Sequence, residues 1–154
     1  MSTRENIASN LVTVIGNISS PEVKKVTRQP FELDELSQQQ YPAVLIQTIE
    51  ETKEDQELGS GAKTRISTLE FGITGFTKGS ESNIDTARNN LASAIETALE
   101  SDITRDGNAL DTEVISIETD AGSLFPYGAV LITVTKLDAM SSLLLIILIF
   151  LFLF

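Results

Sequence analysis

The sequence predicts an α+β fold in which two main helices pack on a four- to five-stranded, mostly antiparallel sheet. Its 154 residues suffice for one domain with a single hydrophobic core. Two segments have the apolar spacing of amphipathic helices, and five others have the apolar enrichment or two-residue alternation of strands. We therefore expect one domain over residues 1–140, packed as helices on a sheet, followed by a hydrophobic tail over residues 141–154.

The first helix is predicted over residues 4–18, where apolar residues recur at helical spacing. Ser2 or Thr3 can cap its start, and Ser19-Ser20-Pro21 ends it. The face that we expect in the core consists of Ile7, Leu11, Val14, Ile15 and Ile18.

Two strands and a long polar excursion follow. Residues 23–28 predict a short strand, residues 31–40 an irregular or one-turn helical connector, and residues 43–49 a central strand covered on both faces. Residues 50–64 are acidic and contain glycine, so we expect a mobile loop between two strands.

The third strand is predicted over residues 65–77, which alternate with a period of two. Its inward side chains are expected to be Leu69, Phe71 and Ile73. Gly72 and Gly75 suggest a bend or bulge within it.

The second helix is expected to begin with a capping box formed by Ser82 and Asp85 and to end before Gly107. One face of it carries Ala87, Leu91, Ala94, Ile95, Ala98 and Leu99. Two more strands follow over residues 112–120 and 128–137, with inward candidates Ile115, Ile117, Val130, Ile132 and Val134.

Composition limits the chemistry that this chain can perform. It has no cysteine and no histidine, so disulfides, thiolate nucleophiles and Ser-His-Asp triads are excluded, and we expect no cofactor, no metal and no enzymatic activity. Lys and Arg number 11 against 22 Asp and Glu, a net charge of −11. We therefore do not expect a nucleic-acid-binding face, which must neutralise phosphates. The charge keeps isolated subunits apart until they meet a complementary surface.

Three constellations have to be weighed as possible sites. The run from Gly59 to Thr64 departs from a phosphate-binding loop, because Ala62 precedes Lys63 and a strand follows. The turn-forming residues Asp102, Asp106, Asn108 and Asp111 lack the ligand spacing of a calcium loop. The carboxylates between residues 50 and 57 lie in a polar segment without a pocket that could separate their pKa values. We interpret all three as surface segments.

The end of the chain differs from the rest, because Leu143–Phe154 is twelve consecutive apolar residues. A helix that spans a bilayer needs about 20. Three interpretations stay open: a peculiar extension past the domain, burial against a neighbouring subunit, and membrane interaction. The polar residues after Met1 lack a signal-peptide core, so we do not expect export.

Taken together, short motifs spread over residues 4–137 resemble those of the tail terminator proteins of long-tailed phages. The residues that carry the resemblance are Arg4-Glu5-Asn6-Ile7-Ala8, Val26-Thr27-Arg28-Gln29-Pro30-Phe31, Tyr41-Pro42-Ala43-Val44, Leu69-Glu70-Phe71, Asp85-Thr86-Ala87-Arg88-Asn89, Leu110-Asp111-Thr112-Glu113-Val114 and Gly122-Ser123-Leu124-Phe125-Pro126-Tyr127-Gly128. The segment after Met140 departs from the family pattern.

The resemblance implies a ring, commonly hexameric, that caps the tail tube, stops its polymerisation and joins it to the head connector. The implied partners are copies of the chain, the tail tube protein and a connector or stopper protein, with genomic DNA only passing through and no membrane. The location would be the tail or neck of the virion, after assembly in the host cytoplasm. The candidate interface residues are Glu50, Glu51, Glu54, Asp55, Glu57, Gly59, Gly61, Lys63, Leu124, Phe125 and Tyr127.

Two other functions remain open. A head-closure or other neck protein could share the same small fold. A membrane-associated protein anchored by Leu143–Phe154 is the alternative from a different class.

Overall fold

The computed structural model describes residues 2–57 and 63–138. The predicted tail over residues 141–154 lies outside the described residues. The elements in chain order are α1 (Thr3–Gly16), β1 (Lys25–Thr27), the single-turn 3₁₀ helices η1 (Leu33–Glu35) and η2 (Gln38–Gln40), β2 (Ala43–Glu57), β3 (Lys63–Lys78), α2 (Ile84–Glu100), β4 (Ala109–Thr119) and β5 (Tyr127–Asp138).

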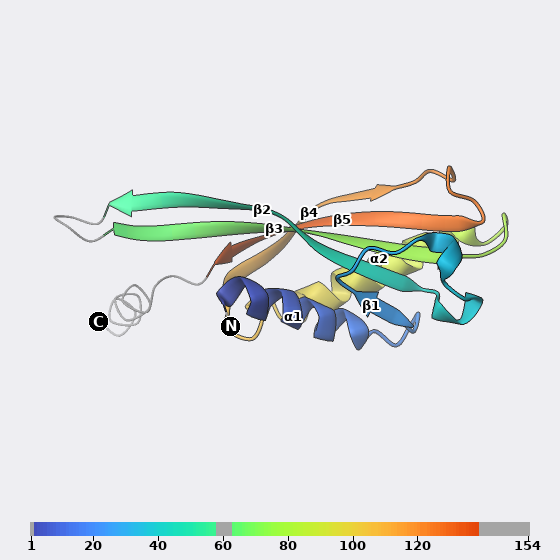
Figure 1. The fold of residues 1–154 in the computed structure, drawn as a ribbon, viewed down its shortest axis with the longest axis horizontal. Helices are drawn as coiled ribbons and strands as arrows, with labels where there is room; N and C mark the ends of the chain where they lie inside the picture. Colours follow the sequence, from blue (N-terminus) through green and yellow to red (C-terminus); the bar gives the residue numbers. More distant parts are fainter. Residues whose placement is uncertain (1, 58–62, 139–154) are drawn as a thin grey trace.

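The strands form one five-stranded sheet in the order β1-β2-β3-β5-β4, in which β1 runs parallel to β2 and the other neighbours are antiparallel. Both helices lie on the same face of this sheet, as Figure 1 shows. The predicted α+β fold is confirmed.

The core lies between the helices and the sheet. The α1 residues Ile7, Leu11 and Ile15 and the α2 residues Leu91, Ile95 and Leu99 are buried against it. The predicted inward residues of the third and fifth strands are buried as well: Leu69, Phe71, Ile73, Val130, Ile132 and Val134. Burying this apolar area is the main driving force for the fold.

Glycine lets α2 approach the sheet closely. A Cβ on Gly75 would lie 2.7 Å from a methyl carbon of Leu91, and one on Gly128 would lie 2.7 Å from Cγ of Arg88. The expected bend at Gly72 and Gly75 is absent from the register of β3 with β5, which is continuous. The register shift lies instead in β2, between Thr48 and Glu50.

The predicted capping box does not form. The α2 helix begins at Ile84, and its N-cap is Asn83, whose side chain makes no cap hydrogen bond to the helix. Asn83 Oδ1 instead accepts from the Ser80 amide at 2.9 Å and closes the preceding turn. Asp85, expected in the box, forms an ion pair with Arg88 at 2.6 Å.

The inward residues predicted for β4 are exposed. Ile115 is 51% exposed, because Val114 packs against the core and Ile115 is the extra residue at the register shift between Val114 and Ser116. Ile117 pairs with the core residue Ile132 but is 40% exposed, because β4 lies at the sheet edge. Strict alternation fails where an extra residue enters a strand.

Two expectations about the second strand hold only in part. The β2 strand is covered on both faces at its start, where Val44 and Ile46 are buried in the main core and Ala43 is buried in a second cluster with Leu36 and Tyr41, but Ile49 is 54% exposed. The predicted loop over residues 50–64 does not begin at residue 50, because β2 continues to Glu57 and β3 starts at Lys63.

Candidate interaction surfaces

A two-stranded ribbon extends from one end of the sheet. The β1 strand pairs only with residues 43–45 of β2, and β5 pairs with β3 only from Thr68 onward. Within residues 2–57 and 63–138, residues 53–57 and 63–67 therefore pair only with each other, and we call these two segments the ribbon. In Figure 1 it runs past the N-terminal end of α1, beyond the cover of both helices.

The strand register shows that an acidic, polar segment adopts this form. The cross-strand pairs continue without a break from Lys53 with Ser67 to Glu57 with Lys63. The same residues read along the chain alone look like a charged loop.

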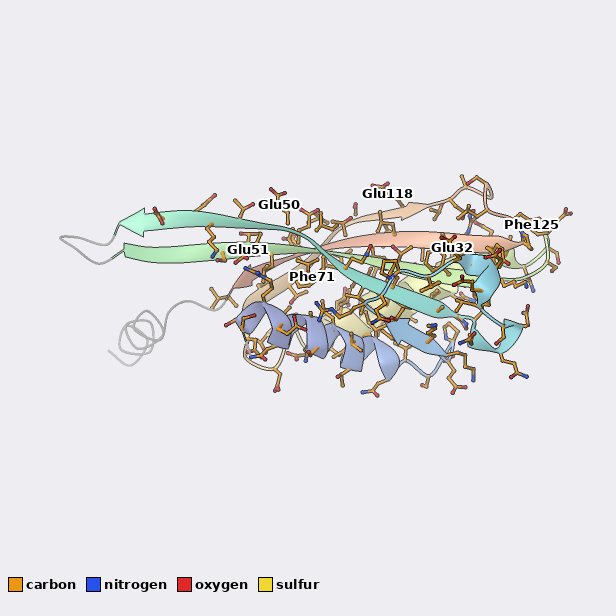
Figure 2. All side chains as sticks on the ribbon, in the orientation of Figure 1. Glu32, Glu50, Glu51, Phe71, Glu118 and Phe125 are labelled. Carbon is orange, nitrogen blue, oxygen red and sulfur yellow. The ribbon has the colours of Figure 1, made fainter. Side chains whose placement is uncertain are left out.

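One face of the sheet at the base of the ribbon is acidic. Glu50 and Glu70 are cross-strand partners, and the row continues through Thr135 of β5 to Glu113 of β4. Glu54 alternates onto the same side as Glu50. We call Glu50, Glu54, Glu70 and Glu113 the acidic face. Figure 2 shows Glu50 pointing away from the helices.

The opposite side of the same segment faces α1. Glu51 is largely buried and forms an ion pair with Arg4 of α1, and Lys53 Nζ lies 3.7 Å from its other oxygen. Figure 2 places Glu51 on the helix side of β2, opposite to Glu50. Of the two neighbouring glutamates, Glu51 is engaged within the subunit and Glu50 is presented outward.

The structure divides the other predicted interface residues between two ends of the molecule. Glu57 and Lys63 belong to the ribbon, and Gly59 and Gly61 lie outside the described residues. Tyr127 pairs with the last residue of β3, at the end of the sheet away from the ribbon. The sequence grouped residues that the fold keeps apart.

At the end of the sheet away from the ribbon, Leu124 and Phe125 are exposed, whereas Tyr127 is half-buried. Leu124 is 40% exposed and Phe125 is 47% exposed, and Figure 2 shows Phe125 at the end of the molecule away from the ribbon. Tyr127 is half-buried in a small cluster with Leu36 and Tyr41, and its ring centroid lies 5.7 Å from that of Tyr41.

A buried ion pair, which sequence reasoning missed, holds the loop between β4 and β5. Arg88 of α2 donates to Oδ1 of Asp120, and Asp120 also accepts from the amides of Leu124 and Ala129, both at 3.0 Å. Burial raises the pKa of Asp120, but these hydrogen bonds and the nearby guanidinium outweigh burial and lower the pKa below its ordinary value. The hydrogen bond to Asp120, and then that to Asp85, raises the pKa of Arg88.

A second buried arginine was also missed. Arg105 is fully buried and donates to Oγ1 of Thr112 at 3.1 Å, to Oδ1 of Asn10 at 3.4 Å and to the carbonyl of Leu99. Burial lowers the pKa of Arg105, and the charge of Asp102 opposes this effect. The guanidinium joins α1, the end of α2 and β4.

Asp102, weighed above as a calcium ligand, stabilises a turn. Its carboxylate accepts from the amide and hydroxyl of Thr104, at 3.1 and 2.9 Å, and from the amide of Asp106 at 2.7 Å. Burial raises the pKa of Asp102, but these bonds outweigh it and lower the pKa. Within residues 2–57 and 63–138, no three acidic side chains gather closely enough to hold a metal ion.

A basic segment surrounds β1 at the edge of the sheet. Lys24 pairs with Glu22 and Arg28 pairs with Glu5, and all four side chains are exposed by more than a third. The ammonium of Lys25 lies 5.4 Å from the ring centroid of Phe31. We call Lys24, Lys25 and Arg28 the basic segment.

An open groove runs between α1 and α2. It is lined by small and apolar residues, including Val14, Ile18, Ala87, Ala94 and Ala98, together with serine, threonine and asparagine. No titratable side chain lines it among the residues that the structure describes. The groove therefore offers shape but no acid, base or ligand set. Within the same described part of the chain, no helix is long and apolar enough to cross a membrane.

Comparisons with known proteins add a likeness to solved structures. No family model matches the chain, and no curated protein matches it. A solved chain from the virion of a native gene transfer agent particle is similar with a TM-score of 0.39 and 10% sequence identity, over 90% of this chain and 92% of that chain. At this TM-score the shared backbone geometry is too limited to support an argument about function.

Proposed function

We propose that this chain is a non-enzymatic structural subunit of a phage-like virion, and specifically a tail terminator. In this role, copies form a ring that caps the tail tube, stops its growth and joins it to the head connector. A hexamer is the expected form, as in the family that the sequence resembles. The observation that carries the proposal is the ribbon.

The ribbon is a structure that needs a partner. An isolated two-stranded hairpin is at best marginally stable in water, and three or more strands or a packed helix are needed for independent stability. Among the residues that the structure describes, no third strand pairs with residues 53–57 and 63–67. Contact with another subunit would supply the missing cover, as it does for other segments that order on binding.

Two further features suit the proposed role. The exposed Leu124 and Phe125 lie at the opposite end of the sheet from the ribbon, so one subunit can contact two different neighbours. The net charge of −11 suits a channel wall along which DNA must slide without binding. The partners would be other copies, the tail tube protein and the connector, in the neck of the virion.

The test is to assemble the tail tube protein of the same phage with and without the purified chain. We expect tubes of defined length with a ring at one end when the chain is present, and overlong tubes in its absence, measured by electron microscopy. Tubes that grow equally long in both cases would refute the proposal. Normal tails with detached heads, after deletion of the gene, would instead support the head-closure function.

A shortened variant tests the part played by the ribbon. Residues 54–66 are replaced by an Asn-Gly turn, which joins the cross-strand partners Lys53 and Ser67 through a favoured two-residue hairpin. The core is untouched, so the variant should fold but fail to cap tubes. Capping at the wild-type level would show that the ribbon is dispensable.

A further inference from the structure

Resting on the proposed function, we infer that the acidic face of one copy docks on the basic segment of a second copy. The interface would pair Glu50, Glu54, Glu70 and Glu113 of one subunit with Lys24, Lys25 and Arg28 of the next. The contact is head-to-tail, because each subunit presents its acidic face to one neighbour and its basic segment to the other.

The acidic face has an electrostatic reason to accept a cationic partner. Glu50 and Glu70 lie directly opposite one another on neighbouring strands, and like charges at such positions are destabilising. Neither carboxylate forms an ion pair with any residue that the structure describes. A cation from outside the subunit would remove the repulsion and use both carboxylates at once.

The basic segment is the matching surface within the described part of the chain. Three of the chain's 11 basic residues fall between positions 24 and 28. Two others, Arg88 and Arg105, are buried, and Arg4 and Lys53 are paired with Glu51. The ion pairs of Lys24 and Arg28 are solvent-exposed, and exposed pairs contribute little, so they can be exchanged for a partner's carboxylates.

The placement of the two surfaces favours assembly in one direction. Lys25 pairs with Ala43 at the start of β2, whereas Glu54 lies eleven residues further along the same strand, about 36 Å away at 3.3 Å per residue. The basic segment lies on and beside β1, which pairs with the start of β2, so it is far from Glu50 and Glu54 further along β2. A contact between two different patches is heterologous, and it closes a ring when the rotation per subunit allows.

Charge reversal with rescue tests the inference. The first variant combines Glu50→Lys with Glu70→Lys, and the second combines Lys24→Glu with Arg28→Glu, which leaves Lys25 on the ring of Phe31. Each should weaken ring formation at least tenfold, measured by sedimentation velocity and by capping of tail tubes. All four substitutions in one chain should restore both. Circular dichroism checks that each variant is folded.

The matched control separates the interface from overall charge. Glu81→Lys with Glu100→Lys changes the net charge as much as the first variant does, at exposed positions outside both surfaces. This control should assemble like the wild type. If the reversals leave assembly unchanged, or if the fourfold variant is not rescued, the inference fails while a wild-type ring that caps tubes keeps the proposed function. A wild-type chain that neither forms rings nor caps tubes contradicts the proposed function itself.

Discussion

At the scale of single residues, the pair of Arg88 and Asp120 joins α2 to the loop that presents Leu124 and Phe125. Both side chains are more than nine-tenths buried, so neither charge has water as a substitute partner. Removal of one member of a buried pair leaves the other uncompensated, which commonly costs about 3–5 kcal/mol. The conformation of the β4–β5 loop therefore depends on this contact.

The substitution Asp120→Asn should lower the free energy of unfolding by about 3 kcal/mol, because it leaves the Arg88 guanidinium buried without its main counter-charge. Urea denaturation measures the change. The control is Asp85→Asn, which removes the other carboxylate on Arg88; Asp85 is 74% exposed, and its loss should cost at most about 1 kcal/mol. Equal losses in the two variants would contradict the assigned role of Asp120.

The pH dependence of stability gives a second readout of the same contact. The pKa of Asp120 is lowered in the folded protein from its ordinary value of 3.8, so its stabilising effect is fully present above that value. The effect is lost as the pH falls below 3.8 through the folded pKa. Because asparagine does not titrate there, the difference in stability between wild type and Asp120→Asn should be constant at higher pH and should shrink below pH 3.8. A difference that is flat down to pH 2 would contradict the argument.

The burial of two arginines was not predicted from the sequence. Charged side chains are normally assigned to the surface, and neither Arg88 nor Arg105 was placed in the interior. A signal was present for Arg88, which lies four residues after Ile84 and three before Leu91 on the buried face of α2. The partners of Arg105 are Asn10, which lies in α1 and is distant in the sequence, and the backbone carbonyl of Leu99 at the end of α2. No local sequence pattern could indicate these contacts.

At the scale of elements, α2 and β5 are joined by a close approach at Gly128. A Cβ there would lie 2.7 Å from Cγ and 2.8 Å from Cδ of Arg88, and 3.0 Å from the Ile84 side chain. The substitution Gly128→Ala should therefore displace Arg88 and lower the free energy of unfolding by about 1–3 kcal/mol, as overpacking does. The matched control is Gly122→Ala.

That control meets no neighbouring atom but lies at φ +85°, so its cost is conformational strain in the loop. Thermal unfolding gives both stabilities, and the near-ultraviolet circular dichroism of the tyrosines reports on packing around Tyr127. Gly128→Ala should alter both readouts, and Gly122→Ala only the stability. A fully stable Gly128→Ala variant would contradict the close packing.

The ribbon should be the least protected part of the described sheet in the free subunit. Within the described part of the chain, no third strand pairs with the ribbon, and local opening is easiest where buried contacts are few. Amide hydrogen exchange should therefore be fast over residues 53–57 and 63–67 and slow over residues 69–75, and it should slow in the ribbon on assembly. Protection of the ribbon equal to that of the sheet centre in the free subunit would contradict its independence.

Most elements followed from patterns within the sequence, and the exceptions have a common cause. Both helices and the strands β3 and β5 were predicted because their apolar spacing reports on burial in the same subunit. The extension of β2 to Glu57 was missed because its cross-strand partners, from Glu70 to Lys63, are invisible in a pattern read along one strand. The Ile115 assignment failed because a register shift in β4 breaks the alternation, and Ile117, although it pairs with Ile132, is exposed because β4 is an edge strand.

At the scale of the whole molecule, the fold places acidic, basic and apolar surface residues in separate regions. The acidic face, the basic segment and the exposed Leu124 and Phe125 lie on separate elements, while the interior is closed by the two helices (Figure 1). The acidic balance is visible in the sequence, and the absence of enzymatic activity stays a prediction. The sequence could not predict the separation of the surfaces, which depends on strand order.

Assembly should depend strongly on salt. An interface built on exposed charges is screened when the Debye length falls from about 10 Å at 0.1 M to about 3 Å at 1 M salt. Rings of the wild-type chain should therefore dissociate as sodium chloride is raised, measured by light scattering, while circular dichroism stays unchanged. Rings that persist at 1 M salt would indicate an interface held mainly by apolar contacts, with Leu124 and Phe125 as the first residues to substitute.

The register shift between Thr48 and Glu50 has a geometric consequence. It lies on β2 between the point where β1 attaches and the start of the ribbon, so it sets the direction in which the ribbon leaves the domain. Bulges bend a strand and increase its local twist. Because β2 connects the attachment point of the basic segment on β1 with Glu50 and Glu54, its curvature would fix the turn from each copy to the next, and a single inserted residue would decide the diameter of the closed circle.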